Sequence, residues 1–515
     1  MEKSSNKRLT INIVANCIAF AVNFIISFFL TPYIVENVGK ETYGFLALGN
    51  NFVNYVSLIT IALNSMASRF ITIRIQNKEC DSASKYFSSV LLANILICLV
   101  IAIPLALVII FMQNLVDITN ENIADIKILW TFLFINIGVD LISSVFAISA
   151  FAKNRVDLTA KANIIASISK VVVVILCYTF FKPYIFYIGI ATVVYSIITL
   201  ILNIRYYKKL TPEVKIEKKL FSKNCIKELV SAGIWNTVSR VGGIALTELD
   251  LLLSNLLINA SAMGTLSLVK TIPSYMTSLT ATITNAFMPN LTITYAKYKE
   301  NKEIMLEKIR NSIKILIFFH SVMYGILIAY SDKFYMLWLG KEVAGDIQFM
   351  YILGIITVGG CFISAVSYVM LNIFTIFNKL KLSSISVVIT GLISSILTYV
   401  LVKYTSLGLI AVAGVSVVLV IIRNIAVLMP YAAKCIGVPW YTFYKDMLLN
   451  IFVILYSIAI GLIFKSIIEI DSWLLLIIAC AITAICIILI NCFILMNREQ
   501  RKEMFKKFFQ ERKRK

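Results

Sequence analysis

Charged residues are scarce in this chain. They make up 15% of its 515 residues, whereas hydrophobic residues make up 59%. Water-soluble domains typically have about 25% charged and 45–50% apolar residues. No polar stretch is long enough to form a core of its own. These deficits exclude a soluble domain and predict an all-α polytopic membrane protein, with lipid covering the apolar surplus.

Several motifs of enzymes and metal proteins are also missing. The ten cysteines are scattered without a CxxC pair, so neither a metal cluster nor a disulfide framework is expected. No GxxxxGK[ST] motif occurs, which excludes ATP hydrolysis through a P-loop. No sizeable loop carries a carboxylate pair that could serve catalysis. We therefore expect a protein that is not an enzyme and that uses no cofactor.

Long apolar runs dominate what is present. A helix that crosses a bilayer needs about 20 apolar residues, and fourteen stretches meet this requirement. The apolar run after Met1–Thr10 is too long for a cleavable signal and is expected to be the first span. The expected spans are 9–37, 43–73, 83–112, 122–151, 156–181, 183–206, 226–258, 261–295, 304–331, 346–376, 382–402, 406–432, 443–465 and 472–497.

The basic residues set a direction for these spans. With the first loop outside, most of the 48 Lys and Arg residues fall in cytoplasmic segments, as the positive-inside rule requires. The net charge of +21 therefore reflects membrane topology rather than binding of nucleic acid. This distribution predicts a multi-pass protein of the cytoplasmic membrane with both termini in the cytoplasm.

An internal repeat suggests how the spans are grouped. Tyr43–Ile73 aligns with Met263–Ile293 and pairs identical residues, including Gly44 with Gly264. Because spans two and eight then correspond, the repeat is parallel, with six spans in each half. The tail is expected either to lie on the membrane as an amphipathic helix or to be solvated. The expected parts are a six-helix lobe (1–206), a cytoplasmic basic linker (207–225), a second six-helix lobe (226–432), helices 13–14 (433–497) and a basic tail (498–515).

Polar residues form stripes on the spans that repeat each other. Polar groups inside a bilayer usually face protein or water. Stripes on equivalent helices of both halves predict a shared polar cavity between the lobes, and ordinary packing by Ser, Thr and Asn is the alternative. The stripes contain Asn12, Asn16 and Asn23 in span one, Asn50, Asn54 and Asn64 in span two, Asn236, Arg240 and Asp250 in span seven, and Lys270 and Asn285 in span eight.

Two arginines are candidates for contact with an anion. Arg240 lies at mid-depth in span seven, and no partner at its level is evident from the sequence. A guanidinium group can bind phosphate oxygens in a bidentate way, so Arg240 is the first choice. Arg69 lies near the inner end of span two and is the second choice, with snorkelling to the interface as the alternative.

The remaining intramembrane charges are expected to have structural roles. Asp140 and Lys170 lie at similar depths and are expected to pair, as are Asp250 and Lys270 in adjoining spans. His320 is the only histidine. It is expected to be a hydrogen-bonded interior residue rather than a proton carrier.

Two stretches resemble a known family. Thr31–Leu48 (TPYIVENVGKETYGFLAL) is similar to the first hairpin of polysaccharide and oligosaccharide-lipid flippases, where a YG pair begins span two. Glu248–Asn290 is also similar, with an acid in LDLLLSNLL, a hairpin glycine (Gly264) and a proline (Pro289). These flippases share a superfamily with multidrug extruders and lipid II flippases.

The resemblance implies a V-shaped transporter that works by alternating access. Its cargo would be an undecaprenyl-diphosphate-linked oligosaccharide for surface polysaccharide, with the lipid tail remaining among membrane lipids, along spans 13–14. H⁺ or Na⁺ would be the coupling ion. For such a cargo, Asn12, Asn50, Asn54 and Asn236 could supply amide groups to the sugar, and Arg240 and Lys270 are the candidates for contact with the diphosphate. Asn16, Asp250 and Arg69 complete the set of candidate cavity residues.

Three other functions remain open from the sequence. A cation-coupled multidrug or metabolite antiporter would need an ionisable site, for which Asp140, Asp250 or His320 could serve. A lipid II flippase would share the fold but carry a different glycan. A membrane glycosyltransferase or polymerase is less compatible with the short external loops.

Overall fold

The computed structural model describes residues 2–118, 122–297, 301–340, 346–377 and 379–495. Over these residues the chain consists of helices and connecting turns without a strand, which confirms the all-α fold. The predicted amphipathic tail (498–515) lies outside the described residues. Large apolar side chains are exposed along the helices, for example Ile103, Ile467 and Phe493, each about 70% exposed. A continuous exposed apolar surface of this kind requires lipid.

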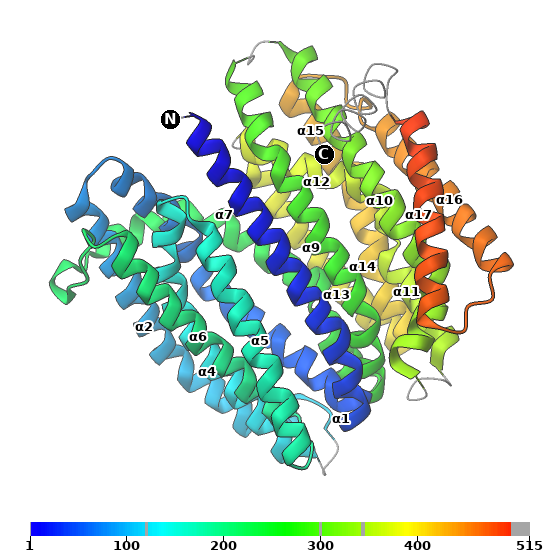
Figure 1. Cartoon of the computed structure of the whole chain (residues 1–515), viewed down its shortest axis with the longest axis horizontal. Coiled ribbons are helices and arrows are strands. Elements are labelled where there is room, and N and C mark those ends of the chain that lie inside the picture. Colours follow the sequence, from blue (N-terminus) through cyan, green and yellow to red (C-terminus); the bar gives the residue numbers. More distant parts are fainter. Residues whose placement is uncertain (1, 119–121, 298–300, 341–345, 378, 496–515) are drawn as a thin grey trace, which may run out of the picture. The chain divides into compact units, whose positions relative to one another are not determined.

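Contacts divide the chain into two compact units, which Figure 1 shows in sequence colours. Unit 1 comprises residues 1–268 and 391–409, and unit 2 comprises residues 269–390 and 410–515. The predicted six-helix lobes differ from these units because α7 and α8 belong to unit 1, so the lobe division stays a prediction. The helices of unit 1 are α1 (Glu2–Gln76), α2 (Cys80–Ile110), α3 (Met112–Leu115), α4 (Ile123–Ala152), α5 (Val156–Phe180), α6 (Phe186–Leu210), η2 (Lys218–Leu220), α7 (Lys223–Thr247) and α8 (Leu249–Leu257).

Unit 2 contains the remaining helices. Two of them, α9 (Ala260–Lys297) and α13 (Leu380–Tyr404), begin in unit 1 or cross into it. The others are α10 (Lys302–Leu339), α11 (Ile347–Val358), α12 (Cys361–Ile376), α14 (Leu409–Arg423), the π-helical turn η4 (Asn424–Leu428), α15 (Met429–Ile436), α16 (Tyr444–Ile467) and α17 (Trp473–Ile494).

Over the described residues, each of the fourteen predicted spans lies mainly on helix. Eleven helical segments of the described chain are long and apolar enough to cross a membrane, with spans one and two counted together in α1. Two further predicted spans, on α7 and α9, do not meet that hydropathy criterion. They carry the polar stripes of spans seven and eight. Helices that face a polar region rather than lipid have this composition.

Some predicted spans are interrupted. Span seven breaks at Glu248, between α7 and α8, and span ten breaks at Gly359 and Gly360, between α11 and α12. In unit 2, the buried amide of Asn450 on α16 donates to the carbonyls of Cys361 (3.2 Å) and Phe362 (2.6 Å), which lie in the first turn of α12. A side chain of α16 therefore fixes the start of α12 beside the break in span ten, a contact that hydropathy could not reveal.

Unit 1 is built around α4 and α6. Figure 1 shows α2, α4, α5 and α6 side by side, and α4 packs along α6. Polar pairs bridge these two helices within the apolar packing. Asn203 donates to Ser143 (3.0 Å) and Thr211 bonds Ser149 (2.8 Å). Such pairs satisfy polar groups that would otherwise face hydrocarbon.

The backbone around the first hairpin shows why Gly44 and Gly264 of the family motif have no side chain. Gly39 has φ 81°, a conformation that glycine adopts without strain, and it separates the two helical parts of α1. A Cβ at Gly44 would lie 2.9 Å from Cα of Gly264, and a Cβ at Gly264 would lie 2.5 Å from the carbonyl oxygen of Lys40. The two glycines paired by the repeat therefore lie in direct backbone contact.

The basic linker is packed onto α2. Ser84 and Ser88 bond the backbone of Lys215, and Ser89 accepts from the backbone N–H of Ser222 (2.9 Å). Lys153, after α4, donates to Glu213 (2.7 Å). Burial alone would raise the pKa of the Glu213 carboxyl, but the Lys153 bond outweighs burial and the pKa is lowered. The linker is thus an ordered part of unit 1.

Unit 2 has its own apolar core. Residues of α10, α12, α15 and α16 meet in one cluster of fully buried side chains, among them Ile309, Leu316, Val369 and Phe374. Ion pairs join α10 to α16 near both ends of these helices. Arg310 lies 3.4 Å from Asp446, and Lys465 lies 2.6 Å from Asp332.

Candidate functional site

The polar faces of α1 and α7 meet within unit 1. α7 packs along α1, and Asn236 donates to Ser65 (3.2 Å). At the break between α7 and α8, Asn51 (2.7 Å) and Tyr55 (2.8 Å) of α1 both donate to the backbone carbonyl of Glu248. Span two and span seven are therefore joined by polar contacts at two levels, which Ser65, Asn51 and Tyr55 make from positions beside the predicted stripe of span two. The predicted polar cavity stays a prediction.

Arg240 has a partner, contrary to the expectation from sequence. Its Nη2 lies 2.7 Å from Oε1 of Glu248. Arg240 and Glu248 are about two helical turns apart, and the break between α7 and α8 changes their relative direction, so the sequence does not indicate this pair. The Arg240 side chain is 36% exposed, and over the described residues its other N–H groups have no acceptor. The guanidinium group can therefore accept a further anion on its free side.

The other predicted stripe residues of α1 divide into exposed and bonded groups. Asn16, Asn50 and Arg69 are exposed, and no partner for their side chains occurs in the part of the chain that the structure describes. Asn54 is half-buried. The amide of Asn64 instead accepts from Asn94 of α2 (3.1 Å). Exposed amides on an apolar helix are suited to a polar ligand, and their role in substrate binding stays a prediction.

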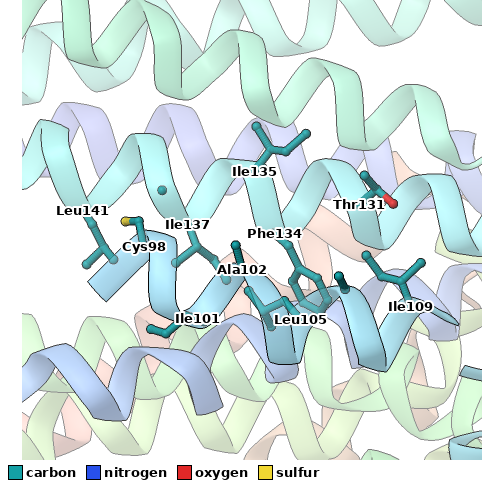
Figure 2. Close-up of a pocket in the computed structure, with 12 residues that line it drawn as sticks. Cys98, Ile101, Ala102, Leu105, Ile109, Thr131, Phe134, Ile135, Ile137 and Leu141 are labelled. Carbon is teal, nitrogen blue, oxygen red and sulfur yellow. The ribbon is translucent and has the colours of Figure 1, made fainter. Parts of the chain in front are cut away.

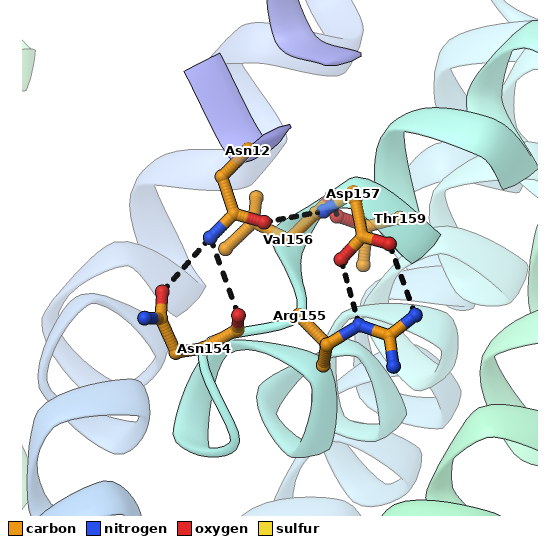
Figure 3. Close-up of polar contacts among 6 residues, drawn as sticks. All are labelled: Asn12, Asn154, Arg155, Val156, Asp157 and Thr159. Carbon is orange, nitrogen blue, oxygen red and sulfur yellow. Dashed lines mark hydrogen bonds and ion pairs between the residues drawn. The ribbon is translucent and has the colours of Figure 1, made fainter. Parts of the chain in front are cut away.

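Asn12 is committed to the turn between α4 and α5, as Figure 3 shows. Its Nδ2 donates to Oδ1 of Asn154 (2.8 Å), and its Oδ1 accepts from the backbone N–H of Asp157 (3.0 Å). Asn154 has φ 53°, a left-handed conformation that Asn tolerates better than most residues. Arg155 pairs with Asp157 beside it (2.9 Å). Asn12 thus holds the start of α1 against this turn.

This contact predicts a stability difference between two asparagines of the same helix. Asn12→Ala removes bonds from a 7% exposed amide and should lower the free energy of unfolding by about 1–2 kcal/mol. Asn16→Ala, one helical turn on and exposed, should change it by less than about 0.5 kcal/mol. Thermal unfolding of the detergent-solubilised protein measures both. Equal effects of the two substitutions would contradict a stabilising contact between Asn12 and the turn that joins α4 to α5.

The other predicted charges have distinct settings. Asp250 is 8% exposed and lies in the first turn of α8, in unit 1. Lys270 is half-buried on α9, in unit 2. Their pairing and their contact with a diphosphate stay predictions.

Asp140 and Lys170 do not form the expected ion pair. Asp140 on α4 accepts from Nδ2 of Asn136 (3.0 Å) and from Ser196 on α6 (2.5 Å). Lys170 on α5 interacts with Asp140 only at longer range. The two residues are near each other, as their similar depths predicted. The nearest partners of the Asp140 carboxyl group, however, are the neutral side chains of Asn136 and Ser196.

His320 is an interior residue, as expected. It is fully buried in unit 2, where its Nε2 lies 3.0 Å from Thr280 and its Nδ1 lies 3.1 Å from Ser364. Tyr324 packs edge-on against the ring. Hydroxyl groups can satisfy both nitrogens of a neutral imidazole, so the setting favours a structural role.

Unit 1 also has a pocket of about 330 Å³ between α2 and α4. Figure 2 shows Cys98, Leu105, Phe134 and Leu141 along it, with Thr131 at one end. Its lining is almost entirely apolar. Such a surface accommodates a hydrocarbon chain and offers nothing to a sugar.

Three residues of the polar contact were not anticipated. Asn51 and Tyr55 lie beside the predicted stripe rather than on it, and Glu248 was not among the predicted site residues. Counting tyrosine hydroxyls as polar would have drawn attention to Tyr55. Over the described residues, no group of His, Cys, Asp and Glu could hold a metal ion.

The fold resembles that of solved membrane transporters and flippases. An inward-facing MATE-family multidrug resistance transporter of the MOP superfamily superposes with a TM-score of 0.66, at 15% identity, over 84% of this chain and 97% of that one. The lipid II flippase MurJ in an inward closed conformation gives 0.65, at 15% identity, over 93% and 97%. The chain thus shares the fold of these proteins, and its long apolar helices make it a multi-pass membrane protein.

Sequence comparison identifies the family. The model of the family described as "Polysaccharide biosynthesis protein" matches residues 9–295, more than half of the chain. The chain belongs to this family, which confirms the resemblance seen in the hairpin motifs. A relative in Bacillus subtilis (strain 168), the uncharacterized membrane protein EpsK, is 26% identical over 504 residues, covering 97% of this chain and 98% of EpsK.

Proposed function

We propose that this protein flips an undecaprenyl-diphosphate-linked oligosaccharide across the cytoplasmic membrane for surface polysaccharide biosynthesis. The observation that carries the proposal is the partly exposed Arg240, whose remaining N–H groups have no acceptor in the described chain. Membership of the polysaccharide biosynthesis family supports a glycan as part of the cargo. The likeness of fold to a lipid II flippase supports movement of a lipid-linked cargo rather than synthesis.

The chemistry of the three cargo parts fits different surfaces. A diphosphate requires a cation, which Arg240 supplies. A sugar requires hydrogen-bonding groups, for which the exposed Asn50 and Asn16 are suited. A polyprenyl tail requires only apolar surface, which lipid and the exposed helices provide.

The direction of transport follows from the predicted topology. Both termini would lie in the cytoplasm, because most Lys and Arg residues then fall on that side. The glycan would enter from the cytoplasmic leaflet, where its activated sugar precursors are available, and would leave on the outer face. No covalent bond changes, so the protein acts as a transporter by alternating access.

Reconstitution into liposomes tests the proposed function. Lipid-linked oligosaccharide placed in one leaflet should become accessible to a membrane-impermeant glycosidase or lectin in the other leaflet only when the protein is present. Lipid II and a fluorescent cationic dye serve as competing cargos in the same vesicles. Faster movement of lipid II would identify a lipid II flippase, and export of the dye alone would identify an antiporter. Lengthening of the glycan would overturn the transporter assignment.

A further inference from the structure

Three polar side chains meet between α4 and α6, and the number of hydrogens that they can donate indicates their protonation state. Ser196 on α6 lies within hydrogen-bonding distance of both Oδ1 of Asp140 (2.5 Å) and Oδ1 of Asn136. Asn136 also donates to Oδ2 of Asp140 (3.0 Å). Together, the three side chains form a closed ring of three contacts.

This ring lacks one hydrogen if Asp140 is ionised. Each contact requires one hydrogen, but a serine hydroxyl has a single hydrogen and an ionised carboxylate has none. The amide of Asn136 supplies one more, which leaves three contacts and two hydrogens. Reversing the amide of Asn136 does not help, because the contact between its oxygen and Asp140 then lacks a donor. A third hydrogen on the carboxyl group completes the ring in either orientation.

We propose that Asp140, Asn136 and Ser196 form a proton-binding site in which the Asp140 carboxyl group carries the bound proton. In one closed arrangement, Asn136 donates to Asp140, Asp140 donates to Ser196, and Ser196 donates to Asn136. Asn136 and Ser196 are buried (7% and 0% exposed), whereas Asp140 is exposed. The two buried partners therefore fix the position of the carboxyl group that carries the proton.

Charges near the ring give the deprotonated state an alternative partner. Lys170 on α5 and Tyr195 on α6 are the titratable groups that interact with Asp140. Lys170 has no carboxylate within ion-pairing distance in the part of the chain that the structure describes. Loss of the proton breaks one ring contact and creates a negative charge that attracts Lys170. Binding of one proton would thus change the charge between α4, α5 and α6, which suits a site that couples transport to H⁺.

Infrared difference spectroscopy of the full-length protein in lipid nanodiscs tests this site without any cargo. The native protein at neutral pH should show the carbonyl stretch of a protonated carboxyl group that is absent from Asp140→Asn. Ser196→Ala should shift that band, because it removes the ring partner. Ser143→Ala, a matched control on the same helix pair whose hydroxyl bonds Asn203, should leave the band unchanged.

Stability supplies a second readout. Asp140→Asn preserves the ring, since an amide can donate to Ser196 and accept from Asn136, so it should unfold at the same temperature as the native protein or above. The native protein alone should lose stability as rising pH removes the proton. Absence of an Asp140 carboxyl band at neutral pH would overturn the proposal. Loss of the band on adding Na⁺ at constant pH would also overturn it, by showing a metal-cation site. Neither result bears on whether the protein flips a glycan.

Discussion

Arg240→Ala should lower the initial rate of lipid-linked oligosaccharide flipping by about 10- to 100-fold. A hydrogen bond to a charged group contributes about 1.5–3 kcal/mol, and each 1.4 kcal/mol corresponds to a factor of ten. Arg240→Lys should lie between the native protein and the alanine variant, because lysine keeps the charge but cannot make a bidentate contact. The liposome assay measures all three rates.

Glu248 decides whether this loss reflects cargo binding. Its carboxylate lies 2.7 Å from Nη2 of Arg240 and is only 14% exposed. The carboxylate therefore neutralises part of the guanidinium charge that would attract a phosphate on the free side of Arg240. Glu248→Gln removes this negative charge, so it should tighten binding of inorganic pyrophosphate or undecaprenyl diphosphate to the purified protein. Isothermal titration calorimetry provides the measurement.

The double variant separates cargo binding from a structural brace. Arg240→Ala alone removes the guanidinium group that pairs with the carboxylate of Glu248, which is itself destabilising. Arg240→Ala combined with Glu248→Gln removes both charges and relieves that penalty. If Arg240 binds the cargo, the double variant folds like the native protein but remains slow in flipping. Full recovery of flipping in the double variant would refute a diphosphate contact at Arg240.

The helical fold and the positions of the spans could be predicted from the sequence because both depend on local composition. Apolar runs of sufficient length define membrane helices without reference to any partner. The polar stripes on spans two and seven were also visible, and in unit 1 these spans pack together. Each of these features repeats along a single helix, so periodicity alone reveals it.

The partners of individual side chains could not be predicted in the same way. Arg240 was expected to be unpaired because no residue pattern in the sequence predicts the helix break at Glu248. This break brings the Glu248 carboxylate toward the guanidinium group of Arg240. Asp140 and Lys170 were matched by depth, but depth does not include the rotation of each helix or competing neutral donors. Asp140 contacts Ser196 rather than Lys170 because α6, not α5, packs closely along α4.

Gly233→Ala should have the largest effect on stability of any single methyl group added to α7. A Cβ at this buried glycine would lie 2.0 Å from the carbonyl oxygen of Ala62 and 2.7 Å from its carbonyl carbon. These are backbone atoms of α1, which cannot rotate away as a side chain can. The helices must separate, and overpacking of this kind costs about 1–3 kcal/mol or more. Separation would also break the polar contacts between α1 and α7, so flipping should be lost as well.

Gly243 on the same helix is the matched control. A Cβ at Gly243 meets no atom within 4 Å, so Gly243→Ala should stabilise α7 by about 0.5–1 kcal/mol through its better helix propensity. The two alanine variants therefore carry the same chemical change and opposite expected shifts in unfolding temperature. Thermal unfolding in detergent, followed by circular dichroism, compares them directly. A rise in unfolding temperature for both variants would show that α1 and α7 do not approach as closely as their glycine contact indicates.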